Sequence, residues 1–183
     1  MSALTPANQL TLLRMLLIPA FALLVIYGKL GQALAVFVFA GVTDALDGLL
    51  ARRHGQKTAL GAWLDPMADK LLLTTMFVVL TLPLEHLVQP LPLWLTVLVI
   101  SRDIGIVLTV AIINFASGPR TFRPSMLGKV ATAVYITTGV VALLANWLGR
   151  PLVVVDVFVY VSLAIACVSG LHYLARVTRL VEE

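Results

Sequence analysis

Apolar runs, each close to twenty residues long, alternate with short polar segments along the whole of this chain. A hydrocarbon core about 30 Å thick requires about 20 helical residues, so each run is long enough to span a membrane. Helices are therefore expected at residues 10–27, 32–53, 59–82 and 93–115, with a fifth that ends near residue 147 and a sixth that ends near residues 176–179. The pattern predicts an all-α, polytopic membrane protein with about six transmembrane helices.

The composition supports this class. Apolar residues make up 60% of the chain and charged residues 12%, and the mean hydropathy is +1.01. A soluble domain is nearer half apolar and a quarter charged. The predicted spans and their short loops use all 183 residues, so we expect a single transmembrane domain over residues 1–183. The one cysteine, Cys167, lies in an apolar run and is interpreted as a small packing residue.

Basic residues predict the orientation of the chain. The formal net charge is +4, and cations gather in the loops at residues 52–57 and 118–129. Cytoplasmic loops carry an excess of lysine and arginine, which places these two loops and both termini in the cytoplasm. The loop that contains Glu85 has little positive charge and is expected outside. The basic residues are thus interpreted as determinants of topology, and we expect no nucleic-acid partner.

Four aspartates lie within 26 residues of this apolar sequence, although the whole chain has only nine acidic residues. They are Asp44, Asp47, Asp65 and Asp69. An ionised carboxylate at membrane depth is costly unless it is paired or bound to a metal. On helices, residues three or four apart project from one face, so each pair shares a face. Two facing pairs would form an oxygen-lined cage for a hard cation, with Mg²⁺ preferred and Mn²⁺ as the alternative.

Small and basic residues accompany these aspartates. Gly48 and Ala51 lie on the same helical stripe as Asp44 and remove side-chain bulk there. Arg52 adds a planar cation that can bind a phosphate through two parallel hydrogen bonds. Gly61 permits close approach of the two helices. These residues predict a metal and diphosphate site, in a polar cavity that opens to the cytoplasm.

The spacing resembles that of a known family. The chain contains the complete pattern D-x2-D-G-x2-A-R-x8-G-x3-D-x3-D between residues 44 and 69. This is similar to the signature of the CDP-alcohol phosphatidyltransferases, integral membrane enzymes of phospholipid synthesis. Eight specified positions at fixed spacing, in a chain of suitable length and hydropathy, make a chance match rare. The competing interpretation is a buried carboxylate network that only holds helices together.

The resemblance implies a reaction and a set of roles. An acceptor hydroxyl would attack the lipid-bearing phosphorus of CDP-diacylglycerol and release CMP. Asp44, Asp47 and Asp65 would hold the metal together with Asp69, which would also be the general base. The residues implied at the nucleotide and its phosphates are Asn8, Thr11, Arg14, Gly48, Ala51, Arg52, Thr58 and Gly61. The signature helices contain no serine, cysteine or histidine near the aspartates as a nucleophile, so direct displacement is expected.

Cations in the second half of the chain are expected to bind the acceptor. Arg102 is the first candidate for the acceptor phosphate, and Lys129 and Arg123 come from the second basic loop. Asp103 follows Arg102 directly. Because neighbours on a helix point about 100° apart, we expect these two side chains to serve different partners.

Two acceptors are compatible with these segments. ISRD at residues 100–103 and RPSMLGKVATAV at residues 123–134 resemble segments of CMP-forming cardiolipin synthases, which use phosphatidylglycerol. The second segment is also similar to phosphatidylglycerophosphate synthases, which use glycerol 3-phosphate. Those enzymes commonly have Arg-Glu and then Leu-Arg, where this chain has Arg102-Asp103 and then IVLTV. We therefore favour phosphatidylglycerol, with glycerol 3-phosphate as the alternative.

Further expectations concern partners and rival functions. We expect membrane lipids around the chain, a homodimer with the last two helices as scaffold and dimer surface, and a bacterial inner membrane as its location. An aromatic prenyltransferase is also helical, aspartate-rich and Mg²⁺-dependent, but the A-R-x8-G element argues against it. A cation channel or transporter with an acidic site would need neither Arg52 nor the small residues Gly48 and Ala51.

Overall fold

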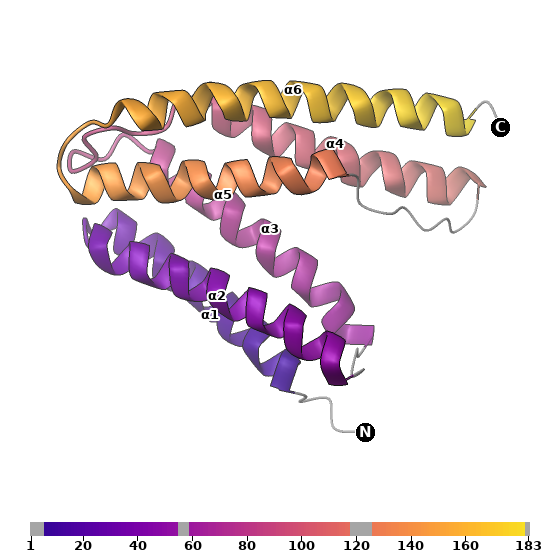
Figure 1. Cartoon of the computed structure of the whole chain (residues 1–183), viewed down its shortest axis with the longest axis horizontal. Helices are drawn as coiled ribbons and strands as arrows, with labels where there is room; N and C mark the ends of the chain where they lie inside the picture. The colour runs from indigo at the N-terminus through magenta and orange to yellow at the C-terminus, as the bar shows by residue number, and fades with distance from the viewer. Residues whose placement is uncertain (1–5, 55–58, 118–125, 182–183) are drawn as a thin grey trace. The chain divides into compact units, whose positions relative to one another are not determined.

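The described residues form six α-helices and contain no strand, which confirms the all-α class. The structure is a computed structural model that describes residues 6–54, 59–117 and 126–181 (Figure 1). The helices are α1 (Pro6–Ile26), α2 (Leu30–His54), α3 (Ala59–Thr81), α4 (Leu93–Ser117), α5 (Met126–Trp147) and α6 (Val153–Val181). Each helix expected from the sequence therefore corresponds to one helix of the structure.

Proline and glycine mark the ends of two of these helices. α1 begins at Pro6, whose fixed φ and missing N–H suit the first helical position. It ends before Gly28, which has a φ of 72°, a left-handed conformation that favours glycine. The Gly28 N–H donates to the carbonyl of Val25 at 3.0 Å. α5 ends in the same way before Gly149, which has a φ of 64°. Local sequence thus explains where these helices stop.

Two of the described helical segments, Met126–Trp147 and Val153–Tyr173, are long and apolar enough to cross a membrane. Large apolar side chains are also exposed on the helices, among them Leu16, Phe115 and Tyr160. Such surfaces suit contact with acyl chains, which are as apolar as the side chains. The structure and the apolar sequence together support a membrane protein, while six spans and a cavity open to the cytoplasm stay predictions.

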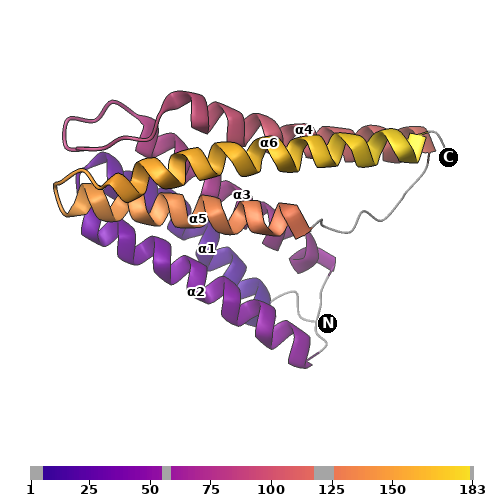
Figure 2. The ribbon, with the colours of Figure 1, turned by 45° about the horizontal axis from the view of Figure 1, so that its top comes forward.

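The chain groups into two compact units, residues 1–90 with 142–150 and residues 91–141 with 151–183. In the first unit, α1 packs against both α2 and α3 (Figures 1 and 2). Phe21 of α1 and Phe37 of α2 are buried with their ring centroids 5.5 Å apart, and Phe77 of α3 is also fully buried. This packing supports the two helices that carry the aspartates. The single domain expected from the sequence stays a prediction.

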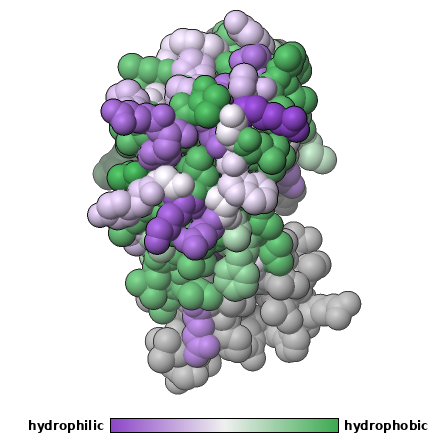
Figure 3. Space-filling view, turned by 90° about the vertical axis from the view of Figure 1, so that its left-hand side faces the viewer, coloured by the Kyte–Doolittle hydropathy of each residue, from purple (hydrophilic) through white to green (hydrophobic). Residues whose placement is uncertain are grey.

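Polar contacts tie the connections of the first unit together. His86, which follows α3, hydrogen-bonds to the carbonyl of Val25 in α1 at 2.7 Å. Asn146 near the end of α5 accepts a hydrogen bond from the Gln89 N–H at 2.8 Å and donates one to the Gln89 carbonyl at 2.9 Å. Figure 3 views the end of the molecule where these connections lie, and it shows hydrophilic side chains gathered among apolar ones.

In the second unit, α4 and α6 run side by side in the same direction (Figures 1 and 2). The hydroxyl of Tyr173 in α6 donates to the carbonyl of Ile106 in α4 at 3.3 Å. The hydroxyls of Thr138 in α5 and Ser162 in α6 are 2.8 Å apart, and both residues are buried. These contacts connect α6 to both of its neighbours.

Candidate active site

The aspartate pattern lies on the second half of α2 and the first half of α3. Asp44 and Asp47 belong to α2, and Asp65 and Asp69 belong to α3. The helical spacing on which the metal cage was predicted is therefore confirmed for both pairs. The end of α2 and the start of α3 lie at the same end of the first unit as the start of α1 (Figures 1 and 2).

Side chains are described for residues 9, 11–43, 67–109, 112, 115 and 126–173. Asp69 is the one aspartate of the pattern within these ranges. Predicted site residues whose side chains lie outside them are Asn8, Asp44, Asp47, Gly48, Ala51, Arg52, Thr58, Gly61, Asp65 and Arg123. Among the described side chains, no group of three histidine, cysteine or acidic residues is arranged to hold a metal. The metal cage stays a prediction.

Asp69 contacts Arg14 of α1. Nη1 of Arg14 donates to Oδ1 of Asp69 at 2.5 Å, although the two residues are 55 positions apart. Arg14 is 1% exposed, while the side chain of Asp69 is 47% exposed. A buried guanidinium is costly without an anionic partner. The carboxylate of Asp69 therefore contributes to the packing of α1 on α3 through its hydrogen bond with the buried Arg14. Its other side is still accessible to solvent or a ligand.

Thr11 and Arg14 share the buried face of α1. They are three residues apart and are 0% and 1% exposed, as helical spacing predicts for residues on one face. The family resemblance implies that they contact the nucleotide diphosphate, and the structure adds Asp69 as a partner of Arg14. Sequence reasoning missed this contact because α2 lies between the two helices in the chain. The only available signal was that a cation and a carboxylate occur in apolar helices, where charges usually pair.

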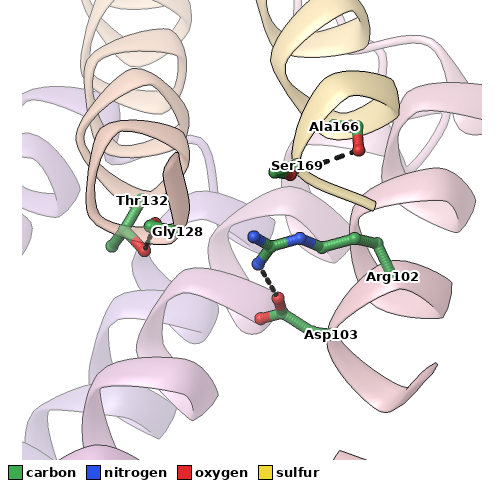
Figure 4. Close-up of polar contacts among 6 residues, drawn as sticks. All are labelled: Arg102, Asp103, Gly128, Thr132, Ala166 and Ser169. Carbon is green, nitrogen blue, oxygen red and sulfur yellow. Dashed lines mark hydrogen bonds and ion pairs between the residues drawn. The ribbon is translucent and has the colours of Figure 1, made fainter. Parts of the chain in front are cut away.

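Arg102 and Asp103 pair with each other, so the expectation that they serve different partners is wrong. Nη1 of Arg102 donates to Oδ1 of Asp103 at 2.8 Å (Figure 4). The long arginine side chain can fold back across the angle between adjacent helical positions. Apolar surroundings strengthen the attraction between the two charges, which favours this conformation. The guanidinium has five N–H groups, so this pair leaves it further donors.

The other acceptor candidates lie in the same unit. Figure 4 shows Arg102 extending from α4 toward the turn of α6 that carries Ser169. Lys129 is exposed in the first turn of α5. The shared role of Arg102 and Lys129 at the acceptor stays a prediction.

Arg102 also lines a cavity along α4 and α6 with a volume of about 930 Å³. Sequence reasoning missed this cavity. Cys167, which was interpreted as a packing residue, is exposed and lines the cavity as well, so that interpretation is wrong. The signal in the sequence is a row of small residues four apart on α4, at Ser101, Gly105 and Thr109, which can mark a place where helices or ligands approach closely.

Comparison with known proteins gives matches over most of the chain. The family model described as CDP-alcohol phosphatidyltransferase matches residues 4–169. A probable phosphatidylglycerophosphate synthase of Mycobacterium tuberculosis is 35% identical over 181 residues, which cover 94% of this chain and 81% of the relative. A human CMP-forming cardiolipin synthase is 35% identical over 148 residues, which cover 72% of this chain and 48% of the relative. A CDP-diacylglycerol–glycerol-3-phosphate 3-phosphatidyltransferase of Pseudomonas fluorescens is 46% identical over 103 residues, which cover 53% of this chain and 50% of the relative.

Proposed function

The chain belongs to the CDP-alcohol phosphatidyltransferase family, and we propose that it transfers the phosphatidyl group of CDP-diacylglycerol to phosphatidylglycerol, giving cardiolipin and CMP. Membership of the family makes the protein a transferase of phospholipid synthesis. The observation that carries the proposal is the aspartate pattern, which is complete between residues 44 and 69 and lies on two consecutive helices.

The donor set suits a hard divalent cation. The residues that would hold it are Asp44, Asp47, Asp65 and Asp69, all carboxylates, and the pattern includes no histidine or thiol. Mg²⁺ is the proposed ion, with Mn²⁺ as the alternative. When bound, the ion would neutralise phosphate oxygens of the donor.

Asp69 is the proposed general base. The acceptor oxygen attacks the lipid-bearing β-phosphorus, and its proton passes to the carboxylate of Asp69. The bond between this phosphorus and the bridging oxygen breaks, and CMP leaves with that oxygen and its electron pair. The contact at 2.5 Å between Arg14 and Oδ1 of Asp69 supports this role, because a base must be held within hydrogen-bond reach of the proton it takes. Arg14 is thus proposed as a positioning residue for Asp69.

The donor would be bound by residues of α1, α2 and the segment before α3. Arg52 is proposed on the diphosphate, where a guanidinium can form two parallel hydrogen bonds. Gly48, Ala51 and Gly61 would leave room for the nucleotide. The remaining residues proposed at the donor are Asn8, Thr11, Arg14 and Thr58.

Phosphatidylglycerol is the proposed acceptor, with Arg102, Lys129 and Arg123 as cations for its phosphate. The M. tuberculosis and human relatives are both 35% identical to this chain, and one is named a phosphatidylglycerophosphate synthase and the other a cardiolipin synthase. Their names therefore support glycerol 3-phosphate and phosphatidylglycerol equally. Glycerol 3-phosphate, which would give phosphatidylglycerophosphate, is supported by the match over 94% of this chain to the M. tuberculosis protein. The Arg102-Asp103 segment and the apolar cavity beside it favour the lipid acceptor.

The proposed location follows from the apolar helices and the basic loops. Six transmembrane helices would place both termini and the aspartates on the cytoplasmic side of a bacterial inner membrane, and the protein is proposed to be a homodimer. The two described helices that are long and apolar enough to cross a membrane support the location in a membrane. The cations at residues 52–57 and 118–129 support the cytoplasmic placement of the termini and the aspartates.

Release of CMP by the purified protein tests the reaction. The protein in detergent is given CDP-diacylglycerol, Mg²⁺ and either phosphatidylglycerol or glycerol 3-phosphate, and the lipid products are separated by thin-layer chromatography. We expect CMP and cardiolipin, and no turnover after chelation of the metal with EDTA. Phosphatidylglycerophosphate as the main product would replace the proposed acceptor. Absence of CMP with every acceptor would overturn the reaction and leave the prenyltransferase or transporter alternative.

A further inference from the structure

An apolar groove runs along α4 and α6 in the second unit. Its volume of about 930 Å³ lies at the upper end of the range of about 300–1,000 Å³ for ligand sites. At the start of α4 it is lined by Leu93, Trp94 and Val97, and on α6 by Leu171. These four are among the exposed large apolar side chains. An exposed apolar groove of this size suits an apolar ligand.

Two glycines leave the middle of the groove open. Gly105 on α4 and Gly170 on α6 both line it. A Cβ added at either glycine would meet no atom within 4 Å. Small residues in membrane helices usually let two helices approach closely. Since neither glycine has such a neighbour in the described chain, the space above them is available to a ligand.

Arg102 brings one cationic group to this apolar wall. Its side chain is 11% exposed, and its Nη1 is used by Asp103 at 2.8 Å. Its Nε is buried and has no hydrogen-bond partner in the described part of the chain. A buried donor without an acceptor is unfavourable, and a guanidinium readily binds phosphate oxygens. The groove therefore suits a ligand in which a phosphate adjoins an apolar chain.

The part of the groove between the start of α4 and Arg102 is long enough for one acyl chain. Leu93 and Arg102 are nine positions apart on α4, which corresponds to about 14 Å at about 1.5 Å per residue. This is close to half of a hydrocarbon core about 30 Å thick. This stretch of the groove is therefore long enough to hold a large part of one extended acyl chain beside Arg102.

The geometry points to a binding site for one acyl chain of the acceptor phospholipid, with the phosphate of that lipid on Arg102. This inference rests on the proposed function and deepens it, because it makes the acceptor a membrane lipid. Glycerol 3-phosphate would supply the phosphate and leave the groove unfilled. A second copy of the chain would cover the apolar side chains, whereas a phospholipid covers them and also brings an anionic phosphate to the guanidinium of Arg102.

Filling the groove tests the acyl-chain site. Gly105→Phe places a ring in the open space, and Val107→Phe places the same ring on an exposed position of α4 that does not line the groove. We expect Gly105→Phe to raise the KM for phosphatidylglycerol by about tenfold or more, the loss from displacing a few methylenes. The KM for CDP-diacylglycerol should change by less than about twofold, and Val107→Phe should change neither constant by more than that.

Gly170→Leu, with Val168→Leu as its control, repeats the test on α6. This second pair keeps the inference falsifiable if Gly105→Phe does not fold. The inference is overturned if both groove variants fold and leave the KM for phosphatidylglycerol unchanged. It is also overturned if the KM for CDP-diacylglycerol rises instead, since the groove would then hold the donor. Loss of a dimer with unchanged kinetic constants would make the groove an interface between copies and would overturn it too.

Cys167 offers a readout that does not require turnover. It is the one cysteine of the chain and lines the groove, so a bound lipid should slow its alkylation by N-ethylmaleimide. Phosphatidylglycerol should lower the alkylation rate by about fivefold at a concentration a few times its Kd. Diacylglycerol with the same chains, which lacks the phosphate, should protect less, and Arg102→Gln should remove the difference.

The alkylation results separate the two proposals. If the wild-type protein releases no CMP but phosphatidylglycerol protects Cys167 as described, the proposed reaction fails and the lipid site stands. If CMP is released and phosphatidylglycerol gives no more protection than diacylglycerol or glycerol 3-phosphate, the lipid site is overturned and the reaction stands. A difference between the two lipids that survives Arg102→Gln would overturn the assignment of Arg102 to the phosphate.

Discussion

A buried arginine holds the carboxylate that we propose as the base. Arg14 is 1% exposed, and its Nη1 contacts Asp69 at 2.5 Å. Removal of Asp69 would leave a buried cation that lacks this anion, which is destabilising. Because Asp69 is 47% exposed, solvent screens part of this effect. The same contact thus links the stability of the α1–α3 packing to the orientation of Asp69.

The effects of Arg14 and Asp69 on turnover should not be additive. Asp69→Asn should lower kcat by about 100-fold or more, the typical contribution of a general base. Binding of CDP-diacylglycerol should be largely retained, since three aspartates remain. Arg14→Gln should lower kcat less, and the double variant should be no slower than Asp69→Asn, because there is then no base to position. Single-turnover rates measure each variant.

The matched control for this cycle is Glu85→Gln, which neutralises an exposed carboxylate of the α3–α4 connection. Its kcat should equal that of the wild-type protein. Rate losses that multiply in the double variant would contradict the positioning role of Arg14 and would leave it a role at the donor alone.

At the scale of elements, α2 and α3 together present the predicted metal ligands. Each helix carries one pair of aspartates at helical spacing, and neither pair alone has the oxygen ligands that a divalent cation needs. The packing of α1 on both helices holds them in one unit. The metal site is therefore expected to depend on both helices equally.

Replacement of single aspartates by asparagine tests whether the metal site depends on both helices. Asp44→Asn, Asp47→Asn and Asp65→Asn should each abolish turnover, because each removes a charged oxygen ligand and hardly changes side-chain size. Weaker binding of Mg²⁺ to each folded variant is the second expected result. The unfolding midpoint in detergent serves as the control for folding. Substantial activity in any of the three folded variants would contradict the metal cage.

The start of α2 is constrained by the end of α5. A Cβ at Gly31 would lie 2.6 Å from Nε1 and 3.0 Å from Cε2 of Trp147, both in a rigid ring. Gly31→Ala should therefore destabilise the protein by about 1–3 kcal/mol, as overpacking usually does. Gly41→Ala, also in α2 but with no neighbour within 4 Å, should be neutral or stabilising by about 0.5–1 kcal/mol. Thermal unfolding compares the two variants, and equal midpoints would contradict the packing.

At the scale of the whole molecule, the proposed reaction requires the aspartates to face the compartment that holds the nucleotide. The segment at residues 52–57 lies between the two aspartate pairs in the sequence and is strongly basic. The positive-inside rule places such a loop in the cytoplasm. The connection that contains Glu85 and His86 should then face the other side.

Cysteine labelling measures this orientation. In a Cys167→Ser background, cysteines at Gln56 and Arg120 should react with a membrane-impermeant maleimide only from the cytoplasmic side. A cysteine at Glu85 should react only from the opposite side. Inverted membrane vesicles should reverse both results, and a pattern opposite to this one would overturn the proposed orientation.

The sequence alone determined the helices and the family, and the tertiary structure decided which side chains meet. Helix positions and the aspartate spacing depend on local hydropathy, proline, glycine and short-range periodicity, which can be read along the chain. The contact of Arg14 with Asp69 joins residues 55 positions apart, and the fit of Gly31 against Trp147 joins the start of α2 to the end of α5. The groove along α4 and α6 likewise needs two helices that are separated by α5. Such features depend on how helices pack, which is set by many weak contacts between distant segments and leaves no fixed spacing in the sequence.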